Sequence, residues 1–171
     1  MTVIEAPVLG AYHLEPSEST IEFTTRHLFG LAPVRGTFAL REGVVHVADP
    51  VDTSLVRATI DARSFDTGLP ARDRTVGSPQ YLDTAQHPDI TFVANGIDQN
   101  EVLQGTLTVR GRTEPLKVHI DEVRVLGNRL QLRASAEVDR YRWGITAMKG
   151  MTGRRLRFRL SMVATRLGEG R

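Results

Sequence analysis

The stretch Leu103–Ile120, LQGTLTVRGRTEPLKVHI, decides the fold class of this 171-residue chain. Apolar residues or glycine alternate with polar residues over Leu103–Arg110 and again over Leu116–Asp121, and Gly111–Pro115 lies between them as a turn. A period of two places successive side chains on opposite faces of an extended strand. The stretch therefore predicts an antiparallel hairpin with one apolar face and one polar face.

The same alternation recurs along most of the chain, with Gly43 expected to turn the chain into a short strand, Val44–Val47. The other expected strands are Ala11–Glu15, Thr20–Arg26, Val34–Leu40, Thr53–Ala62, Ile90–Ile97, Leu130–Val138 and Leu156–Thr165. Antiparallel strands in this number, joined by short turns, tend to close into a barrel because closure removes exposed sheet edges. We therefore predict an all-β fold, an extended antiparallel barrel of eight strands.

One segment, residues 66–83, breaks the alternation with proline, glycine, aspartate and arginine. Pro70 suits the first turn of a helix, and Asp66 or Thr67 precedes it as a candidate capping residue. The sequence predicts a short helix, Pro70–Val76, followed by a break at Gly77. Because a helix cannot lie within the sheet, we expect this insertion to cross one end of the barrel.

Composition supports a single domain over residues 1–171. With 40% hydrophobic and 25% charged residues the chain resembles ordinary globular proteins, and the absence of cysteine excludes disulfides and thiolate chemistry. We expect about nine N-terminal and about five C-terminal residues to be flexible. The N-terminus lacks the features of a signal peptide and no long apolar run occurs, so a cytoplasmic location is expected.

Five separated motifs resemble the YceI-like family of lipocalin-like polyisoprenoid-binding proteins, in the same order and over about Gly10–Leu167. They are Ala11–Pro16 with Ser19, Ile21, Phe23 and His27; Val34–Phe38; Ser64–Gly68 with Arg72-Asp73, Tyr81–Asp83 and His87–Phe92; Gly105–Gly111 with Pro115; and Asp139-Arg140 with Trp143–Ile145.

The resemblance implies a barrel with a long apolar tunnel that binds an isoprenoid or similar lipid without covalent chemistry. The ligand-binding candidates that follow are Phe23, His27, Phe38, Phe92, Arg140, Trp143, Met148, Met151 and Phe158. Arg72 and Asp73 are expected to hold the insertion over the barrel mouth. No cofactor or metal is expected, and a hydrophobic small molecule is the expected partner, with transient contact to a membrane surface and a homodimer as further expectations.

The interior admits two interpretations. Small residues on several apolar faces, among them Gly36, Ala58, Gly105 and Ala136, leave space for a ligand, or large neighbours fill that space as in ordinary cores. Bulky side chains elsewhere on the same faces could line a ligand cavity or fill the core, so they do not distinguish the two interpretations. The pattern alone leaves both open.

Two other functions compete with lipid binding. Residues 140–171 contain nine Arg or Lys against Glu169 alone, and Arg155, Arg157 and Arg159 share one face of a strand, a stripe that could bind nucleic acid or an anionic surface. A weak hydrolase could draw on Ser78, His87 and Asp89, although the chain has no GxSxG motif. The histidines lack metal-ligand spacing. We expect neither an enzyme nor specific nucleic-acid binding.

Overall fold

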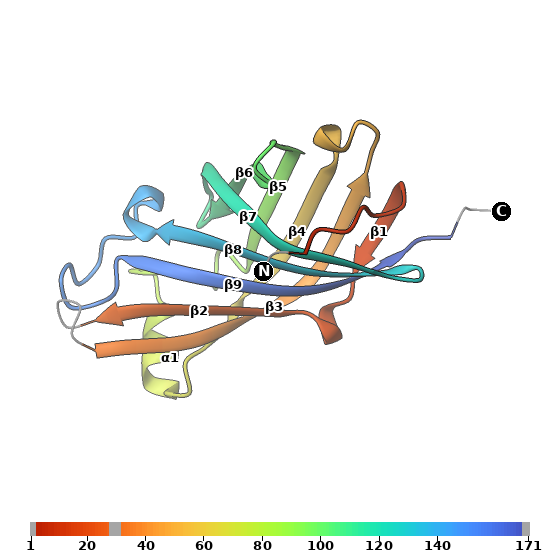
Figure 1. The fold of residues 1–171 in the computed structure, drawn as a ribbon. Coiled ribbons are helices and arrows are strands. Elements are labelled where there is room, and N and C mark those ends of the chain that lie inside the picture. The colour runs from red at the N-terminus through yellow and green to blue at the C-terminus, as the bar shows by residue number, and fades with distance from the viewer. Residues whose placement is uncertain (1–2, 28–31, 169–171) are drawn as a thin grey trace.

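The computed structural model describes residues 3–27 and 32–168, and the side chain of His27 lies outside that description. Nine strand segments form one antiparallel sheet that closes on itself (Figure 1). Their bounds are β1 Gly10–Leu14, β2 Thr20–His27, β3 Ala32–Val47, β4 Leu55–Asp66, β5 Asp89–Ile97, β6 Val102–Val109, β7 Arg112–Leu126, β8 Arg129–Asp139 and β9 Arg155–Arg166.

Strands β1 and β2 act as one interrupted strand of the barrel. Both pair with β3 on one side and with β9 on the other, and the 3-10 turn Pro16–Glu18 separates them. The closed antiparallel barrel therefore has eight strands around its circumference. This confirms the fold predicted from the alternation of apolar and polar residues.

The predicted helix is present as α1, Pro70–Val76, with Pro70 in its first turn. The predicted capping role of Asp66 or Thr67 is wrong, because Leu69 occupies the N-cap position and makes no side-chain cap. The Asp66 carboxylate instead accepts a hydrogen bond from the Gly68 amide at 2.8 Å. Asp66 thus closes the turn ahead of the helix and does not satisfy the helix's own amides.

Gly43 lies inside a strand, and the turn predicted there is wrong. β3 runs without interruption through Gly43, which pairs with Ala58 of β4. A Cβ atom at this position would lie 2.5 Å from Cδ1 of Leu14, so glycine allows a close approach of the Leu14 side chain. Sequence alternation does not distinguish this use of glycine from a turn.

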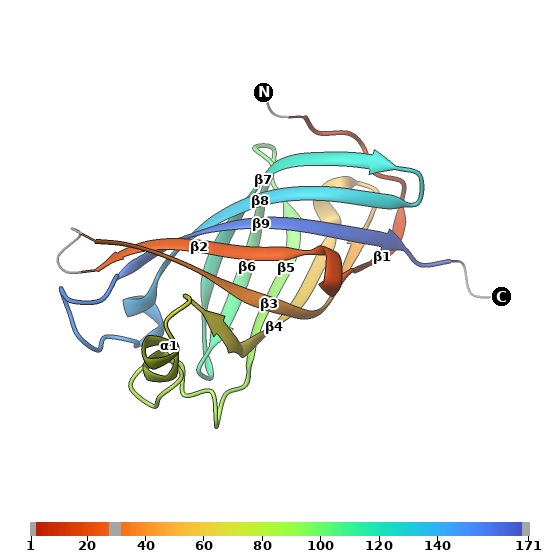
Figure 2. The same cartoon turned by 90° about the horizontal axis from the view of Figure 1, so that it is seen from below.

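The connections between strands gather at two ends of the barrel. We call one the α1 end; it carries the described connections 67–88, 110–111 and 140–154, the last including the 3-10 turn η3, Arg140–Trp143. The opposite end carries residues 3–9, 48–54, 98–101, 127–128 and 167–168. Figure 2 shows α1 and the β8–β9 connection together at one end, with β9 running away from them toward the other.

Two clusters of buried apolar residues occupy the interior. The cluster nearer the α1 end includes Tyr81, Leu82, Trp143 and Ile145 from the connections there. The cluster nearer the opposite end is built around Tyr12, Leu14, Leu40, Val47, Leu130 and Ala164. Half-buried side chains that pack against both clusters join them in the middle; these are Phe38, Ile60, Phe158 and Leu160.

Candidate functional site

Four phenylalanine rings meet in the middle of the barrel. Phe23, Phe38 and Phe158, all predicted as ligand contacts, lie with Phe65, and the ring centroids within this group are 5.4 to 6.3 Å apart. Phe23 is fully buried, whereas Phe38, Phe65 and Phe158 are half-buried. The structure thus brings three of the predicted contacts together in one aromatic group.

Two of the small inward residues are covered by aromatic rings. A Cβ atom on Gly36 would lie 2.3 Å from the Phe23 ring, and one on Gly105 would lie 2.5 Å from the ring of Phe92. At these positions, large neighbours fill the space that glycine leaves, as one of the two interpretations of the sequence expects. Phe92, predicted as a ligand contact, is buried against Gly105.

Between the two clusters, several inward side chains keep part of their surface accessible. Ala58 pairs with Gly43 and with the buried Phe92, so it faces inward, yet it is half-buried. The other half-buried side chains that pack against one or both clusters in this way include Phe38, Val56, Ile60, Leu132, Phe158, Leu160 and Met162. The middle of the barrel is therefore apolar, and its inward side chains keep more accessible surface than the buried residues of the two clusters.

Two hollows on the described part of the chain lie outside this apolar interior. One, of about 450 Å³, lies over the outer face of β2, β3 and β9 and is lined by Glu22, Phe23, Thr24, Arg35, Gly36, Thr37, Asp66, Arg157 and Arg159. The other, of about 670 Å³, follows α1. The tunnel implied by the family resemblance stays a prediction.

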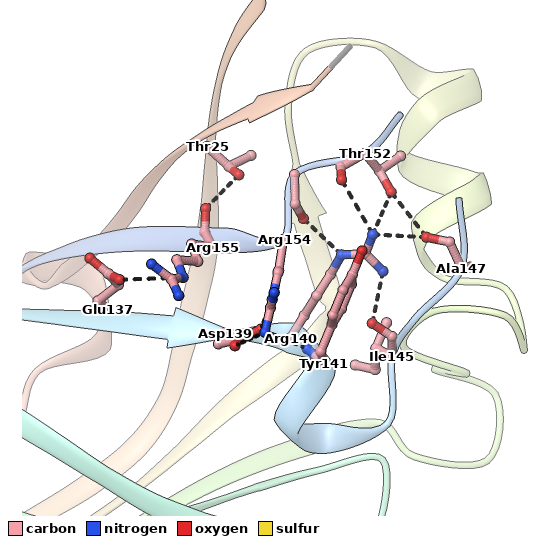
Figure 3. Close-up of polar contacts among 11 residues, drawn as sticks. Thr25, Glu137, Asp139, Arg140, Tyr141, Ile145, Ala147, Thr152, Arg154 and Arg155 are labelled. Carbon is pink, nitrogen blue, oxygen red and sulfur yellow. Dashed lines mark hydrogen bonds and ion pairs between the residues drawn. The ribbon is translucent and has the colours of Figure 1, made fainter. Parts of the chain in front are cut away.

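Trp143 and Arg140, both predicted as ligand contacts, hold the α1 end together. The indole nitrogen of the buried Trp143 donates to the Leu107 carbonyl oxygen at 2.8 Å, which fixes η3 against β6. Arg140, only 7% exposed, directs its guanidinium at the connection that follows η3. Figure 3 shows that guanidinium among oxygen atoms of this connection.

The Arg140 guanidinium binds four backbone carbonyl oxygens and one hydroxyl. Nε donates to Gly153 at 2.7 Å and Nη1 to Ile145 at 2.8 Å, while Nη2 reaches Ala147 at 2.8 Å and both the carbonyl and the hydroxyl oxygen of Thr152. Burial lowers the pKa of Arg140, although arginine remains charged in proteins. Arg140 is thus committed to the backbone of residues 145–153.

A second arginine ties the end of β8 to the start of β9. The Asp139 carboxylate accepts two hydrogen bonds from Arg154, both at 3.0 Å, and one from the Tyr141 amide at 3.1 Å. The Arg154 hydrogen bonds hold the pKa of Asp139 below its ordinary value. Arg154 also lies over the Tyr141 ring, 4.5 Å from its centroid.

Met148 and Met151, also predicted as ligand contacts, lie on the surface. Their side chains are 56% and 37% exposed, and they belong to a turn in which the Met148 carbonyl oxygen accepts from the amides of Met151 and Thr152 at 3.0 Å. Met148 has a φ of 53°, in the left-handed region that non-glycine residues seldom adopt. His27, the remaining predicted contact, has its side chain outside the described residues.

Arg72 and Asp73 bind the segment that leads into α1. The Asp73 carboxylate accepts from the Thr67 amide at 3.1 Å and from the Thr67 hydroxyl at 2.5 Å. Nε of Arg72 donates to the same hydroxyl at 2.8 Å. The two side chains therefore fold the insertion onto itself through Thr67, while Tyr81 and Leu82 place it in the core.

Arg155, Arg157 and Arg159 are exposed on β9, as expected from the alternation. Nε of Arg155 and of Arg157 lie 4.0 and 3.8 Å from the Glu137 carboxylate on the neighbouring strand. Within the described residues, no group of three or more candidate ligands is arranged to hold a metal ion. No helix in the described part of the chain is long and apolar enough to span a membrane.

Two important residues were missed by the sequence reasoning, Phe65 in the aromatic group and Tyr81 beside Arg140. The Tyr81 ring centroid lies 5.8 Å from the Arg140 guanidinium carbon, and its hydroxyl contacts Thr152 at 3.5 Å. Both residues belong to motifs that carry the family resemblance, which was the available signal. Strict alternation along β4 places Phe65 on the polar face, so the pattern did not predict that its ring lies inside the barrel.

The sequence profile of the YceI-like domain matches residues 12–164. The chain belongs to the YceI-like family. Among the relatives, Protein YceI of Escherichia coli O157:H7 is 29% identical over 117 residues, which cover 66% of this chain and 59% of that protein. A UPF0312 protein of Pectobacterium atrosepticum is 29% identical over 108 residues, 61% of this chain and 56% of the relative. The matched region thus spans somewhat more than half of these relatives.

Solved YceI-like structures share the barrel. BcnA of Burkholderia cenocepacia matches with a TM-score of 0.69 at 20% identity, covering 89% of this chain and 99% of that one. A structure described as a polyisoprenoid binding domain from Saccharophagus degradans gives 0.69 at 13% identity, with coverage of 94% and 100%. At these identities the likeness establishes the fold.

Proposed function

We propose that this protein binds a long apolar or amphiphilic lipid, of the polyisoprenoid class, in the middle of its barrel. The observation that supports the proposal is the half-buried apolar zone between the two packed clusters. Membership of the YceI-like family and the name of the Saccharophagus degradans domain support the choice of lipid class.

The chemistry of the zone favours binding over catalysis. The inward side chains there are aromatic and aliphatic, so they can take hydrocarbon out of water, which is worth about 25 cal/mol for each Å² buried. Selectivity would then follow the length of the lipid more than its head group. At the α1 end, Arg140 is already engaged by backbone oxygens, so a head group would find its guanidinium occupied.

A substitution that fills the half-buried middle of the barrel with a larger side chain tests the proposal. Ala58→Phe places a ring in the half-buried middle, and Ala39→Phe makes the same change on the exposed face of β3. The purified proteins would be incubated with a radiolabelled long-chain polyprenol, and bound lipid would be measured by native mass spectrometry and organic extraction. We expect retention by the wild type and by Ala39→Phe, and a loss of roughly tenfold in Ala58→Phe.

Overpacking can destabilise a core by about 1–3 kcal/mol, so thermal unfolding of each variant accompanies the measurement. Leu132→Phe, at a second half-buried inward position, serves if Ala58→Phe does not fold. A folded variant that keeps full lipid retention, or a wild type that retains no lipid, would contradict the proposal.

A carrier role in the cytoplasm and a homodimer belong to the same proposal. Cell fractionation tests the location, and light scattering on the purified protein tests the oligomeric state. Turnover of an ester panel would indicate the hydrolase instead.

A further inference from the structure

The two ends of the barrel carry opposite charge. The described connections at the opposite end contain five acidic residues and no basic one; they are Glu5, Asp49, Asp52, Asp98 and Glu101. Those at the α1 end contain seven basic residues, Arg72, Arg74, Arg110, Arg140, Arg142, Lys149 and Arg154, against Asp73 and Asp83. The described connections therefore differ in net charge between the two ends of the barrel, while the strand residues beside them include both signs, among them Asp139 at the α1 end and Arg129 at the opposite end.

The α1 end also displays apolar side chains beside its cations. Met148 and Met151 flank Lys149 in one turn and are 56% and 37% exposed, and Leu69, just before α1, is 54% exposed. Long, flexible thioether side chains next to lysine and arginine suit the boundary between lipid head groups and acyl chains. Figure 2 places α1 and the 140–154 connection at the same end of the barrel.

The side chain of Arg140 holds the backbone of this turn in place. Arg140 binds the carbonyl oxygens of Ala147 before Met148 and of Thr152 after it, and the turn keeps Met148 at a positive φ that costs free energy for a side chain of this kind. A conformation of this kind persists only where its surroundings determine it. The exposed methionines thus project from a backbone turn that is already held in place, so little backbone entropy is left to lose on binding.

We propose that the α1 end docks on an anionic membrane surface, with the turn Met148–Thr152 entering the head-group region. The inference rests on the proposed function, because it makes the bilayer the source or destination of the bound lipid. Each lysine or arginine near an anionic leaflet adds to the attraction. The acidic connections repel the opposite end from such a surface, so the α1 end faces the bilayer.

The opposite end offers a competing apolar surface, which the experiment must separate. Leu126, in the β7–β8 region, is 52% exposed, and Val51 is 56% exposed. Val51 lies between Asp49 and Asp52, whereas Leu126 is the last residue of β7 and pairs with Arg129. Apolar attraction alone would therefore favour docking of either end, whereas apolar and charge attraction together favour the α1 end.

Flotation with vesicles tests the docking. We expect the wild-type protein to bind vesicles that contain phosphatidylglycerol, to bind phosphatidylcholine vesicles at least roughly tenfold more weakly, and to be released as salt concentration rises. Binding to neutral and anionic vesicles alike, or to neither, overturns the proposal. Salt-sensitive binding to DNA without vesicle binding would also overturn it, in favour of a nucleic-acid surface.

Matched variants locate the surface. Met148→Ser with Met151→Ser, and separately Lys149→Glu, should each weaken binding to anionic vesicles by roughly five- to tenfold. Leu126→Ser at the opposite end and Lys117→Glu on the exposed face of β7 make the same kinds of change elsewhere and should leave it unaltered. Equal losses in the test and control variants contradict the assignment.

Lipid retention in detergent-free solution, measured on the same variants, separates the two proposals. Loss of vesicle binding with intact lipid retention is the expected result for the methionine variant. A protein that retains polyprenol but never binds anionic vesicles would refute the docking alone. One that binds such vesicles through Lys149 but retains no polyprenol would refute the lipid site alone.

Discussion

The buried Arg140 guanidinium donates its hydrogen bonds to backbone carbonyl oxygens, whereas many buried arginines pair with a carboxylate. Its hydrogen-bond partners are the backbone of the 145–153 segment and the Thr152 hydroxyl, so one side chain holds a connection that contains no regular helix or strand. Buried carbonyl oxygens that lose a donor cost about 1–3 kcal/mol each, less where water can reach them. The arginine therefore determines the conformation of this connection.

We predict that Arg140→Met destabilises the protein by about 2 kcal/mol and loosens residues 145–153. Urea unfolding measures the first effect, and hydrogen exchange of the amides in the 145–153 segment measures the second. Arg142→Met is the matched control, because Arg142 is exposed and lies over the Trp143 ring without holding the backbone. Equal effects from the two substitutions would show that Arg140 has no special role.

Asp139 makes stability depend on pH. Its pKa is lowered in the folded protein by the Arg154 hydrogen bonds, so its contribution is complete above the ordinary aspartate pKa of 3.8 and is lost as pH falls through the lower folded value. We predict that Asp139→Asn is less stable than the wild type at pH 7 and that the difference shrinks below about pH 4.

Urea unfolding of both proteins between pH 2 and pH 7 provides the measurement. Asp121→Asn, at an exposed position of β7, controls for the loss of one negative charge. A difference between wild type and Asp139→Asn that stays constant down to pH 2 would rule out the Arg154 interaction as its source.

At the scale of elements, α1 depends on contacts within its own insertion. We predict that Asp73→Ala removes the hydrogen bonds to Thr67, lowers the melting temperature by about 2–4 °C and speeds hydrogen exchange over 69–77. Arg74→Ala, on the exposed side of the same helix, should change neither quantity. A drop in melting temperature without faster exchange in this segment would place the role of Asp73 elsewhere.

The strand pattern could be predicted from sequence because each strand has one apolar and one polar face, but a local irregularity in β4 could not. The pairing of β3 with β4 passes from Thr37–Asp66 to Ala39–Asp61, so β4 holds extra residues there. Ser64 fills this bulge by accepting from the Ala39 amide and donating to the Asp61 carbonyl oxygen. The extra residues shift the parity of β4, which turns Phe65 inward against the alternation.

The candidate site was only partly predictable, for a related reason. Phe23, Phe38 and Phe158 were predicted from apolar strand faces to contact a ligand; the structure brings their rings together, and the ligand contact stays a prediction. Arg140 and Trp143 were expected to touch a ligand, whereas the structure uses their polar atoms to bind backbone. Those partners lie in irregular connections, whose path no periodic pattern specifies.

At the scale of the whole molecule, closure depends on strands that are far apart in the chain. β9 pairs with β8 just before it, but also with β2, where Thr20 lies opposite Ser161, and with β1, where Leu14 lies opposite Ala164. Contacts over such separations form late, because the chain entropy of a long loop must be lost before they can form.

During synthesis on the ribosome, this arrangement leaves the barrel open until β9 emerges. Until then β2 and β8 present unpaired amides and carbonyl oxygens, which can recruit strands of other nascent chains. A chaperone that shields these two edges would therefore raise the yield of native protein more than one that acts after release.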